Sequence, residues 1–461
     1  MLVPTIVDAG LYPRDAEAFL MSAAVTGGVG GMLFVAFRNP EFGVLDRRTG
    51  FLLTVSAWMA VCFFGALPFL FSSLDISFTD AMFETVSGLS TTGATVLSGL
   101  DDMAHGMLLW RSLLQWIGGV GIIVMAIAML PMMRVGGMQL FQRESSDVSG
   151  KPFSRVNQLA RAIGLVYLGL TFACTISLML TGMNFFDAIN HAMTTIATGG
   201  FSTKDASVGY FDSVEIELVI TVFMTLSALP LVFYASIFLR GRRALAEDEQ
   251  IHAFLKILLV AIVLCTVWNI SQGMDALVAL RVSAFNVTSI LTDTGFATTD
   301  FSTWGSFAVG LFFLLFFVGG CAGSTSGAIK IFRWQILFAS AKAHLKTTFS
   351  PSRVVVLKYQ QRLVDPDTLG AVRNFLFIYI TTFAVLSLAV MATGLDFLSS
   401  TSAIAQAMAN AGPGLGPVVG PATNFESVAP TAKWLIIAGM LLGRLELVTA
   451  YVVILPEYWR R

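Results

Sequence analysis

Long apolar runs alternate with short polar connections along the whole chain. A helix needs about 20 mostly apolar residues to cross the hydrocarbon core of a bilayer. We therefore expect spanning helices at residues 19–37, 51–71, 108–133, 162–180, 216–239, 257–268, 306–318, 375–392 and 434–455. Composition agrees, because 56% of the 461 residues are hydrophobic and only 12% are charged, which is unusual for soluble domains. The pattern predicts an all-α integral membrane protein.

Between the helices of each later pair lies a segment that is too long for a turn and too short for a span. Each ends in a glycine-containing patch, usually rich in threonine, at residues 90–95, 197–202, 292–297 and 410–414. Aligned on Gly93, Gly199, Gly295 and Gly412, the patches are separated by 106, 96 and 117 residues. This spacing predicts an internal repeat of roughly a hundred residues, each unit reading helix, half-helix, extended patch, helix.

Basic residues cluster in every second connection. Of the 28 Lys and Arg residues, 22 fall within 38–48, 134–161, 240–256, 330–373 and 460–461. Because cytoplasmic loops retain Lys and Arg, these connections are predicted to lie inside and the four patches outside. The four cysteines lie in apolar stretches, which favours packing over disulfides or metal binding.

The patches offer the oxygen chemistry that a dehydrated cation needs. Non-helical backbone at membrane depth must be buried by protein or line a water-filled cavity. Four extended patches around one axis would point carbonyl oxygens at that cavity and replace the hydration shell of a monovalent cation. Glycine suits the backbone angles this requires, and threonine hydroxyls would add oxygens or brace the loops. The predicted ion-binding residues are Thr91, Thr92, Gly93, Thr198, Gly199, Gly200, Asp293, Thr294, Gly295, Asn410, Ala411 and Gly412.

A single patch would be interpreted more simply as an ordinary turn on the outer surface. Four patches at comparable positions of a repeat, all on one side, reverse that preference. The half-helices, which begin near Asp80 and Asp187 in the first two units, would also aim the negative ends of their dipoles at the pore and so favour cations.

The predicted organisation is four pseudo-repeats, each with a re-entrant pore loop, around a central pore. An N-terminal region with an extra helix (1–49) precedes pore repeat 1 (50–133) and pore repeat 2 with its preceding cytoplasmic loop (134–240). Pore repeat 3 (241–345) has a broken second helix, and pore repeat 4 (346–461) completes the chain.

Small residues interrupt the second helix of the third repeat at 319–328. This run either packs closely against a neighbouring helix or forms an unwound loop that crosses beneath the patches as a gate. The gate candidates are Gly319, Gly320, Gly323, Ser324, Thr325, Ser326 and Gly327. Arg444, an ionisable residue deep within an apolar stretch, joins them. It would form a structural ion pair, repel passing cations while holding the loop, or do both.

Other polar residues carry alternative interpretations. Asp293 would raise the local cation concentration or contribute a carboxylate oxygen to the outermost ion site. Alternatively, it would accept hydrogen bonds from neighbouring backbone amides. Glu84 and Asp80 favour a structural role behind the first patch. His105 and His191 are isolated in the sequence, which argues against catalysis or metal binding.

Several motifs together resemble the Trk/Ktr/HKT superfamily of potassium-uptake proteins, and most closely the bacterial Trk-type membrane subunit (TrkH-like). They are residues 83–95 (FETVSGLSTTGAT), 115–123 (QWIGGVGII), 319–325 (GGCAGST), 412–416 (GPGLG) and 443–446 (GRLE). The resemblance covers nearly the whole chain. Two departures are Asp293, where the family more often has a small or hydroxyl residue, and a start that falls short of a complete extra N-terminal helix pair.

The resemblance implies potassium uptake across the bacterial inner membrane, with a selectivity filter at the patches and a gate at the broken helix. It also implies a homodimer and a cytosolic nucleotide-binding regulatory subunit of the RCK/TrkA type. No covalently bound cofactor is expected, and K⁺ is the transported ion. Glycine at all four filter positions goes with potassium preference in this family.

Two other function classes compete with this interpretation. A secondary transporter coupled to sodium or protons would also use broken helices, although such carriers usually show two related halves rather than four. A membrane-embedded enzyme would need a nucleophile or a metal cluster, and the predicted spans carry no cluster of His, Asp and Glu.

Overall fold

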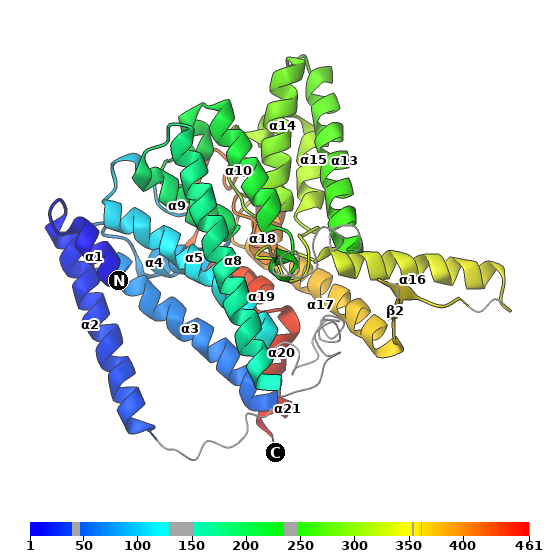
Figure 1. The fold of residues 1–461 in the computed structure, drawn as a ribbon, viewed down its shortest axis with the longest axis horizontal. Helices are drawn as coiled ribbons and strands as arrows, with labels where there is room; N and C mark the ends of the chain where they lie inside the picture. The colour runs from blue at the N-terminus through cyan, green and yellow to red at the C-terminus, as the bar shows by residue number, and fades with distance from the viewer. Residues whose placement is uncertain (39–46, 129–151, 235–247, 353–354, 361, 461) are drawn as a thin grey trace.

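The computed structural model describes residues 1–38, 47–128, 152–234, 248–352, 355–360 and 362–460. The expected spans 108–133 and 216–239, and the basic connections 134–161 and 240–256, fall partly outside these residues. Within the described residues the chain is a bundle of helices with one two-stranded hairpin (Figure 1). This confirms the all-α membrane class.

Four units of related structure follow an N-terminal helix pair, α1 (Leu2–Asp8) and α2 (Pro13–Ala36). The first three units each contain a long helix, a half-helix and a second helix. These are α3 (Arg47–Phe71), α4 (Phe78–Leu89) and α5 (His105–Ala128); α8 (Pro152–Leu180), α9 (Phe185–Ile196) and α10 (Val214–Ser227); and α13 (Glu249–Ser271), α14 (Ala276–Leu291) and α15 (Ser306–Leu315).

The fourth unit begins with α17 (Pro366–Met391) and the half-helix α18 (Phe397–Ala409). It ends with α19 (Pro430–Arg444), α20 (Leu447–Ile454) and the short α21 (Pro456–Trp459). Between units 3 and 4, α16 (Ile331–Phe349) projects from the body (Figure 1) and is followed by the hairpin β1 (Lys358–Tyr359) and β2 (Arg362–Leu363). Short 3-10 turns η1 (Leu100–Asp102), η2 (Ser207–Phe211) and η3 (Phe301–Thr303) follow the first three patches.

Among the described residues, α2, α3, α8, α13 and α17 are long and apolar enough to cross a membrane. Two expected spans are shorter than predicted. Helix α10 ends at Ser227, shortly before Pro230, which cannot continue the helical hydrogen bonding. Helix α15 ends at Leu315, and a loop of residues 316–330 separates it from α16.

The expected span 434–455 is not one continuous helix. Helices α19 and α20 meet at an angle of 112°, with Glu446 at φ 58° between them. The Glu446 carboxylate lies 2.7 Å from the Arg333 guanidinium of α16, and this partner stabilises the break. Apolar composition does not register such a bend, because both arms of the helix remain apolar.

The half-helices share one construction at both ends. Their N-cap side chains accept hydrogen bonds from backbone amides of the first turn, at Ser77, Asn184, Asp275 and Asp396. Each half-helix ends with one residue in the left-handed conformation, and the following amide donates back across the last turn at 2.8–3.0 Å. This cap turns the chain sharply into an extended patch. The left-handed residues are Thr91, Thr198, Asp293 and Asn410.

This cap corrects the alignment of the second patch. Two residues after each left-handed residue stands a glycine with φ between 76° and 89°, at Gly93, Gly200, Gly295 and Gly412. Gly200, rather than Gly199, is therefore the counterpart of Gly93. Two adjacent glycines made the register ambiguous in the sequence.

The units are arranged in a closed circle. At three of the four junctions the second helix of one unit packs against the half-helix of the next, as α5 does on α9, α10 on α14, and α19 on α4. Units 3 and 4 meet where Gly295 approaches the Ala411 carbonyl. The contact of α19 with α4 brings unit 4 back to unit 1, so that the four patches meet at the centre.

Candidate functional site

The site is a ring of four three-residue segments at the centre of the bundle. We call these the ring segments: 91–93, 198–200, 293–295 and 410–412. All the predicted ion-binding residues belong to them, and Thr91, Asp293 and Asn410 are at most 1% exposed. The structure therefore brings together every residue that the sequence predicted for this site.

Glycine lets the ring close. A Cβ built on Gly295 would lie 2.6 Å from the carbonyl oxygen of Ala411, and one on Gly412 would lie 3.3 Å from that of Thr92. Gly93 approaches the carbonyl of Gly199, and Gly200 approaches that of Thr294, even more closely. Each glycine thus packs on the main chain of the next unit, and Gly412 also packs on the preceding unit, with its Cβ position 2.8 Å from the Gly295 Cα.

Main-chain oxygens remain available within the ring. No described residue donates a hydrogen bond to the carbonyl oxygens of Thr92, Thr294 or Ala411. Unit 2 differs, because the side-chain nitrogen of Gln115 donates to the Gly199 carbonyl at 2.5 Å. Buried carbonyls without a donor are costly unless another group satisfies them, and a cation on the axis would do so.

Side chains behind the ring act as braces. The Thr92 hydroxyl lies 2.7 Å from the Ser90 hydroxyl and accepts from the Asn410 amide at 3.0 Å. The Thr294 hydroxyl pairs with that of Thr292 at 2.8 Å. Of the two roles considered for the threonine hydroxyls, these contacts support bracing.

Gln115, which sequence reasoning missed, holds unit 2 from α5. Besides its bond to Gly199, it accepts from the Phe201 amide at 3.0 Å. The signal in the sequence was an amide side chain within an apolar stretch, because a polar group at such a position needs a hydrogen-bond partner. In the structure this side chain is fully buried.

The loop of residues 316–330, the unit-3 loop, contacts the ends of two half-helices. Its Thr325 hydroxyl donates to the carbonyl of Ile196 at the end of α9, and its Ala328 amide donates to Ala409 at the end of α18. Because the ring segments begin directly after these half-helices, the loop lies against the end of the ring where the half-helices lead in. Gly327 also packs on the Ala409 carbonyl.

Hydrogen bonds within the loop, and one from Leu231 outside it, determine the shape of the loop. The Gly319 amide donates to Ile329, and the Gly323 carbonyl accepts from Leu231. The hydroxyl of Ser326 accepts from the Gly320 amide at 3.1 Å and pairs with Ser324 at 2.9 Å. The Lys330 ammonium donates to the Ser326 carbonyl. The predicted small residues therefore form an irregular, hydrogen-bonded loop rather than a helix packing face.

Arg444 ties this loop to unit 1. Its guanidinium donates to the Thr325 carbonyl at 2.9 Å and, more weakly, to that of Gly118 at 3.4 Å. Arg444 is 3% exposed and forms no ion pair within 4 Å among the described residues. Its contacts match the interpretation in which it holds the loop through carbonyls.

Asp293 is fully buried, and among the described residues neither carboxylate oxygen has a hydrogen-bond partner. The Gly327 amide nevertheless faces this carboxyl group, so both interpretations of Asp293 stay open. His191 bonds Ser202 and the Asp187 carbonyl. His105 packs on the Phe186 ring. No group of three or more potential metal-ligating His, Cys, Asp or Glu residues occurs in the described part of the chain.

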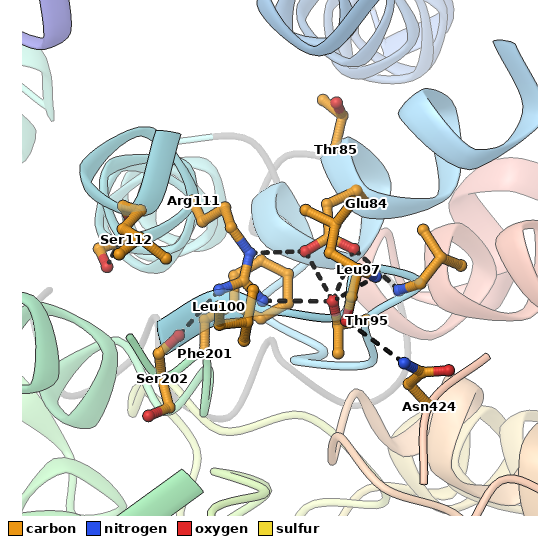
Figure 2. A network of polar contacts seen from close by, with 12 residues as sticks. Glu84, Thr85, Thr95, Leu97, Leu100, Arg111, Ser112, Phe201, Ser202 and Asn424 are labelled. Carbon is orange, nitrogen blue, oxygen red and sulfur yellow. Dashed lines mark hydrogen bonds and ion pairs between the residues drawn. The ribbon is translucent and has the colours of Figure 1, made fainter. Parts of the chain in front are cut away.

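Glu84 and Arg111 form a buried pair behind units 1 and 2, at 2.7 Å. Figure 2 shows this pair at the centre of a network that includes Thr95 and Ser202. The network confirms the structural role expected for Glu84. Sequence reasoning assigned no role to Arg111.

Comparisons with known proteins agree with this architecture. Residues 17–460 match the TrkH family, described as a cation transport protein family. The Trk system potassium uptake protein TrkI of Halomonas elongata is 42% identical, over 100% of this chain and 94% of the relative. The corresponding TrkH of Escherichia coli strain K12 is 40% identical, over 100% of this chain and 96% of the relative.

A solved structure agrees as well. The crystal structure of the potassium transporter TrkH from Vibrio parahaemolyticus matches with a TM-score of 0.91 and 36% identity, covering 100% of this chain and 96% of that one. The resemblance derived from the motifs is confirmed. The chain belongs to the TrkH family of cation transport proteins, and is a multi-pass membrane transporter rather than an enzyme.

Proposed function

We propose that this protein takes up potassium across the inner membrane of a bacterium, through a pore whose selectivity filter is the ring of segments 91–93, 198–200, 293–295 and 410–412. The observation that supports this proposal most strongly is the closed circle in which each ring glycine packs on the main chain of the next unit. Such a ring surrounds one ion with main-chain oxygens.

The choice of potassium rests on the relatives, which are named for potassium uptake or transport. Glycine at all four equivalent positions fits that choice. The half-helices favour cations in general, because their C-terminal ends carry partial negative charge and lead directly into the ring. Asp293 adds a buried carboxylate beside the path, where it would attract cations.

The unit-3 loop is proposed as the gate, with Arg444 as the residue that holds it. The loop lies against the end of the ring where the half-helices lead in, and the Thr325 carbonyl is tied to the Arg444 guanidinium. A loop without helical hydrogen bonds can move without unwinding a helix. Release of this tie would let the loop leave the ion path.

Assembly follows the family pattern. We propose a homodimer that binds a cytosolic nucleotide-binding regulatory subunit of the RCK/TrkA type. The basic residues of α16, Lys342 and Lys346, lie on a helix that projects from the body (Figure 1), which suits docking on the cytoplasmic side.

A secondary transporter remains the competing proposal. The break between α15 and α16 and the 112° bend between α19 and α20 are broken helices of the kind that carriers use. The closed circle of four units favours the channel-like pore, since those carriers usually have two related halves.

The decisive test of the filter is Gly93→Asp in a host that lacks its own potassium uptake. A side chain at this position would strike the Gly199 carbonyl, so we expect a folded protein that supports no growth at limiting potassium. Normal growth would overturn the filter proposal. Gly164→Ala, at an open position of α8, is the matched control and should grow as the parent does.

A further inference from the structure

A charged pair lies directly behind the end of the ring where the chain leaves it. Arg111 of α5 and Glu84 of the half-helix α4 are joined at 2.7 Å, and their side chains are 1% and 0% exposed. Both residues belong to unit 1, yet their contacts extend into unit 2 (Figure 2).

Glu84 holds the chain that leaves the first ring segment. Its carboxylate accepts from the Thr95 hydroxyl and from the Val96 amide, both at 3.0 Å. Thr95 stands two residues after Gly93, so these bonds fix the segment just outside the ring glycine.

Arg111 holds the corresponding chain of unit 2. One guanidinium nitrogen donates to the Ser202 carbonyl at 2.8 Å, and another donates to the Thr95 hydroxyl at 3.3 Å. The guanidinium also lies 4.2 Å from the centre of the Phe201 ring. Ser202 stands two residues after Gly200, the same position that Thr95 has after Gly93.

Three of the units brace the chain that leaves the ring with different side chains, and the fourth has alanine at the equivalent position. Seven residues before each left-handed residue stand Glu84, His191, Asn286 and Ala403. His191 bonds the hydroxyl of Ser202 at 2.9 Å. Asn286 bonds Thr298 at 2.9 and 3.2 Å. Among the described residues at these four positions, only the brace of unit 1 is an ion pair, and its Arg111 partner also holds the next unit.

We propose that Glu84 and Arg111 are positioning residues that fix the spacing between the ring segments of units 1 and 2, and thereby set the preference for potassium over sodium. The inference rests on the proposed function and deepens it. A smaller cation is accommodated only if ring oxygens move inward. The fork of Arg111 resists that movement, because its rigid planar donors join Thr95 and Ser202, which follow the two ring segments.

The test measures rubidium and sodium flux into vesicles that hold the purified protein. The double variant Glu84→Gln with Arg111→Met removes both charges together, so neither remains buried alone. We expect the rubidium-to-sodium flux ratio to fall about tenfold, a change that matches the loss of one hydrogen bond to a charged group. An unchanged ratio in folded protein would overturn the inference.

A second ion pair of the same half-helix is the matched control. Asp80 and Lys433 lie 2.6 Å apart, and neither makes a hydrogen bond to a ring segment. The double variant Asp80→Asn with Lys433→Met should retain the parental flux ratio. An equal fall in this control would mean that general loosening of α4, not positioning, changes the ratio, and would also overturn the inference.

Two milder variants decide the question if the double variant does not fold. Arg111→Lys keeps the charge beside Glu84 but loses the planar fork that reaches Ser202, and Thr95→Val removes the hydroxyl that both partners contact. Each should lower the ratio, and parental ratios in both would refute the inference. A parent protein without rubidium flux would instead count against the proposed function.

Discussion

Replacing Gly295 with alanine tests how tightly the ring is closed. The new Cβ would lie 2.6 Å from the carbonyl oxygen of Ala411, whereas Cβ contacts below 3.0 Å essentially never occur and ordinary contacts begin at 3.4 Å. The fourth segment would therefore have to move by about 0.4–0.8 Å. Gly295 also has φ 89°, and the left-handed region costs an ordinary residue about 1–2 kcal/mol.

The steric and conformational costs act on the same few atoms. We therefore expect the substitution to destabilise the conducting conformation of the ring by about 2–3 kcal/mol. Rubidium uptake should fall by at least about tenfold, since each 1.4 kcal/mol is one factor of ten. The assay is uptake of radioactive rubidium by cells that lack other potassium systems, with protein amount and thermal stability measured alongside.

Gly310→Ala is the matched control for this variant. Gly310 lies on α15 of the same unit, and a Cβ there meets no atom within 4 Å, so uptake should stay at the parental value. Parental uptake by Gly295→Ala as well would refute the close packing of the ring.

Three further substitutions follow from the contacts around the ring. Arg444→Gln should raise rubidium flux several-fold in vesicles, because it weakens the bond that holds Thr325; unchanged or lower flux would count against the gate. Gln115→Leu should lower both the thermal stability and the rubidium-to-sodium flux ratio. It removes the hydrogen-bond partner of two backbone groups in unit 2, and each unsatisfied buried group costs about 1–3 kcal/mol. Parental values of both quantities would contradict this role. Glu446→Gln should lower the free energy of unfolding by about 1.5–3 kcal/mol, because Arg333 loses its charged partner at the bend and keeps its contact with the Phe375 ring. A parental melting temperature would contradict this role.

Much of the site could be predicted from the sequence because the ring depends on the main chain. Glycine and small polar residues recur wherever the backbone must turn sharply from a half-helix into an extended patch, and this requirement is visible in the sequence. The left-handed residues Thr91, Thr198, Asp293 and Asn410 all fell within the predicted set.

The features that were missed depend on side chains that are distant in sequence. Arg111 meets Ser202 across 91 residues, and Gln115 meets Gly199 across 84, so no local pattern reveals either contact. The bend at Glu446 was hidden for a different reason. Hydropathy averages over the apolar arms on both sides and does not detect one residue held by Arg333.

The register of the second patch shows the limit of motif spacing. Gly199 and Gly200 are adjacent, and either could be aligned with Gly93. The backbone separates them, because only Gly200 has the positive φ shared by its three counterparts.

The central claim is that main-chain oxygens of four units surround one cation. Its most direct test is a crystal structure of the protein grown in rubidium, with anomalous diffraction recorded at the rubidium edge. The account predicts a rubidium peak on the axis enclosed by Thr92, Gly199, Thr294 and Ala411. A protein that conducts rubidium but carries its ion only outside this ring would contradict it.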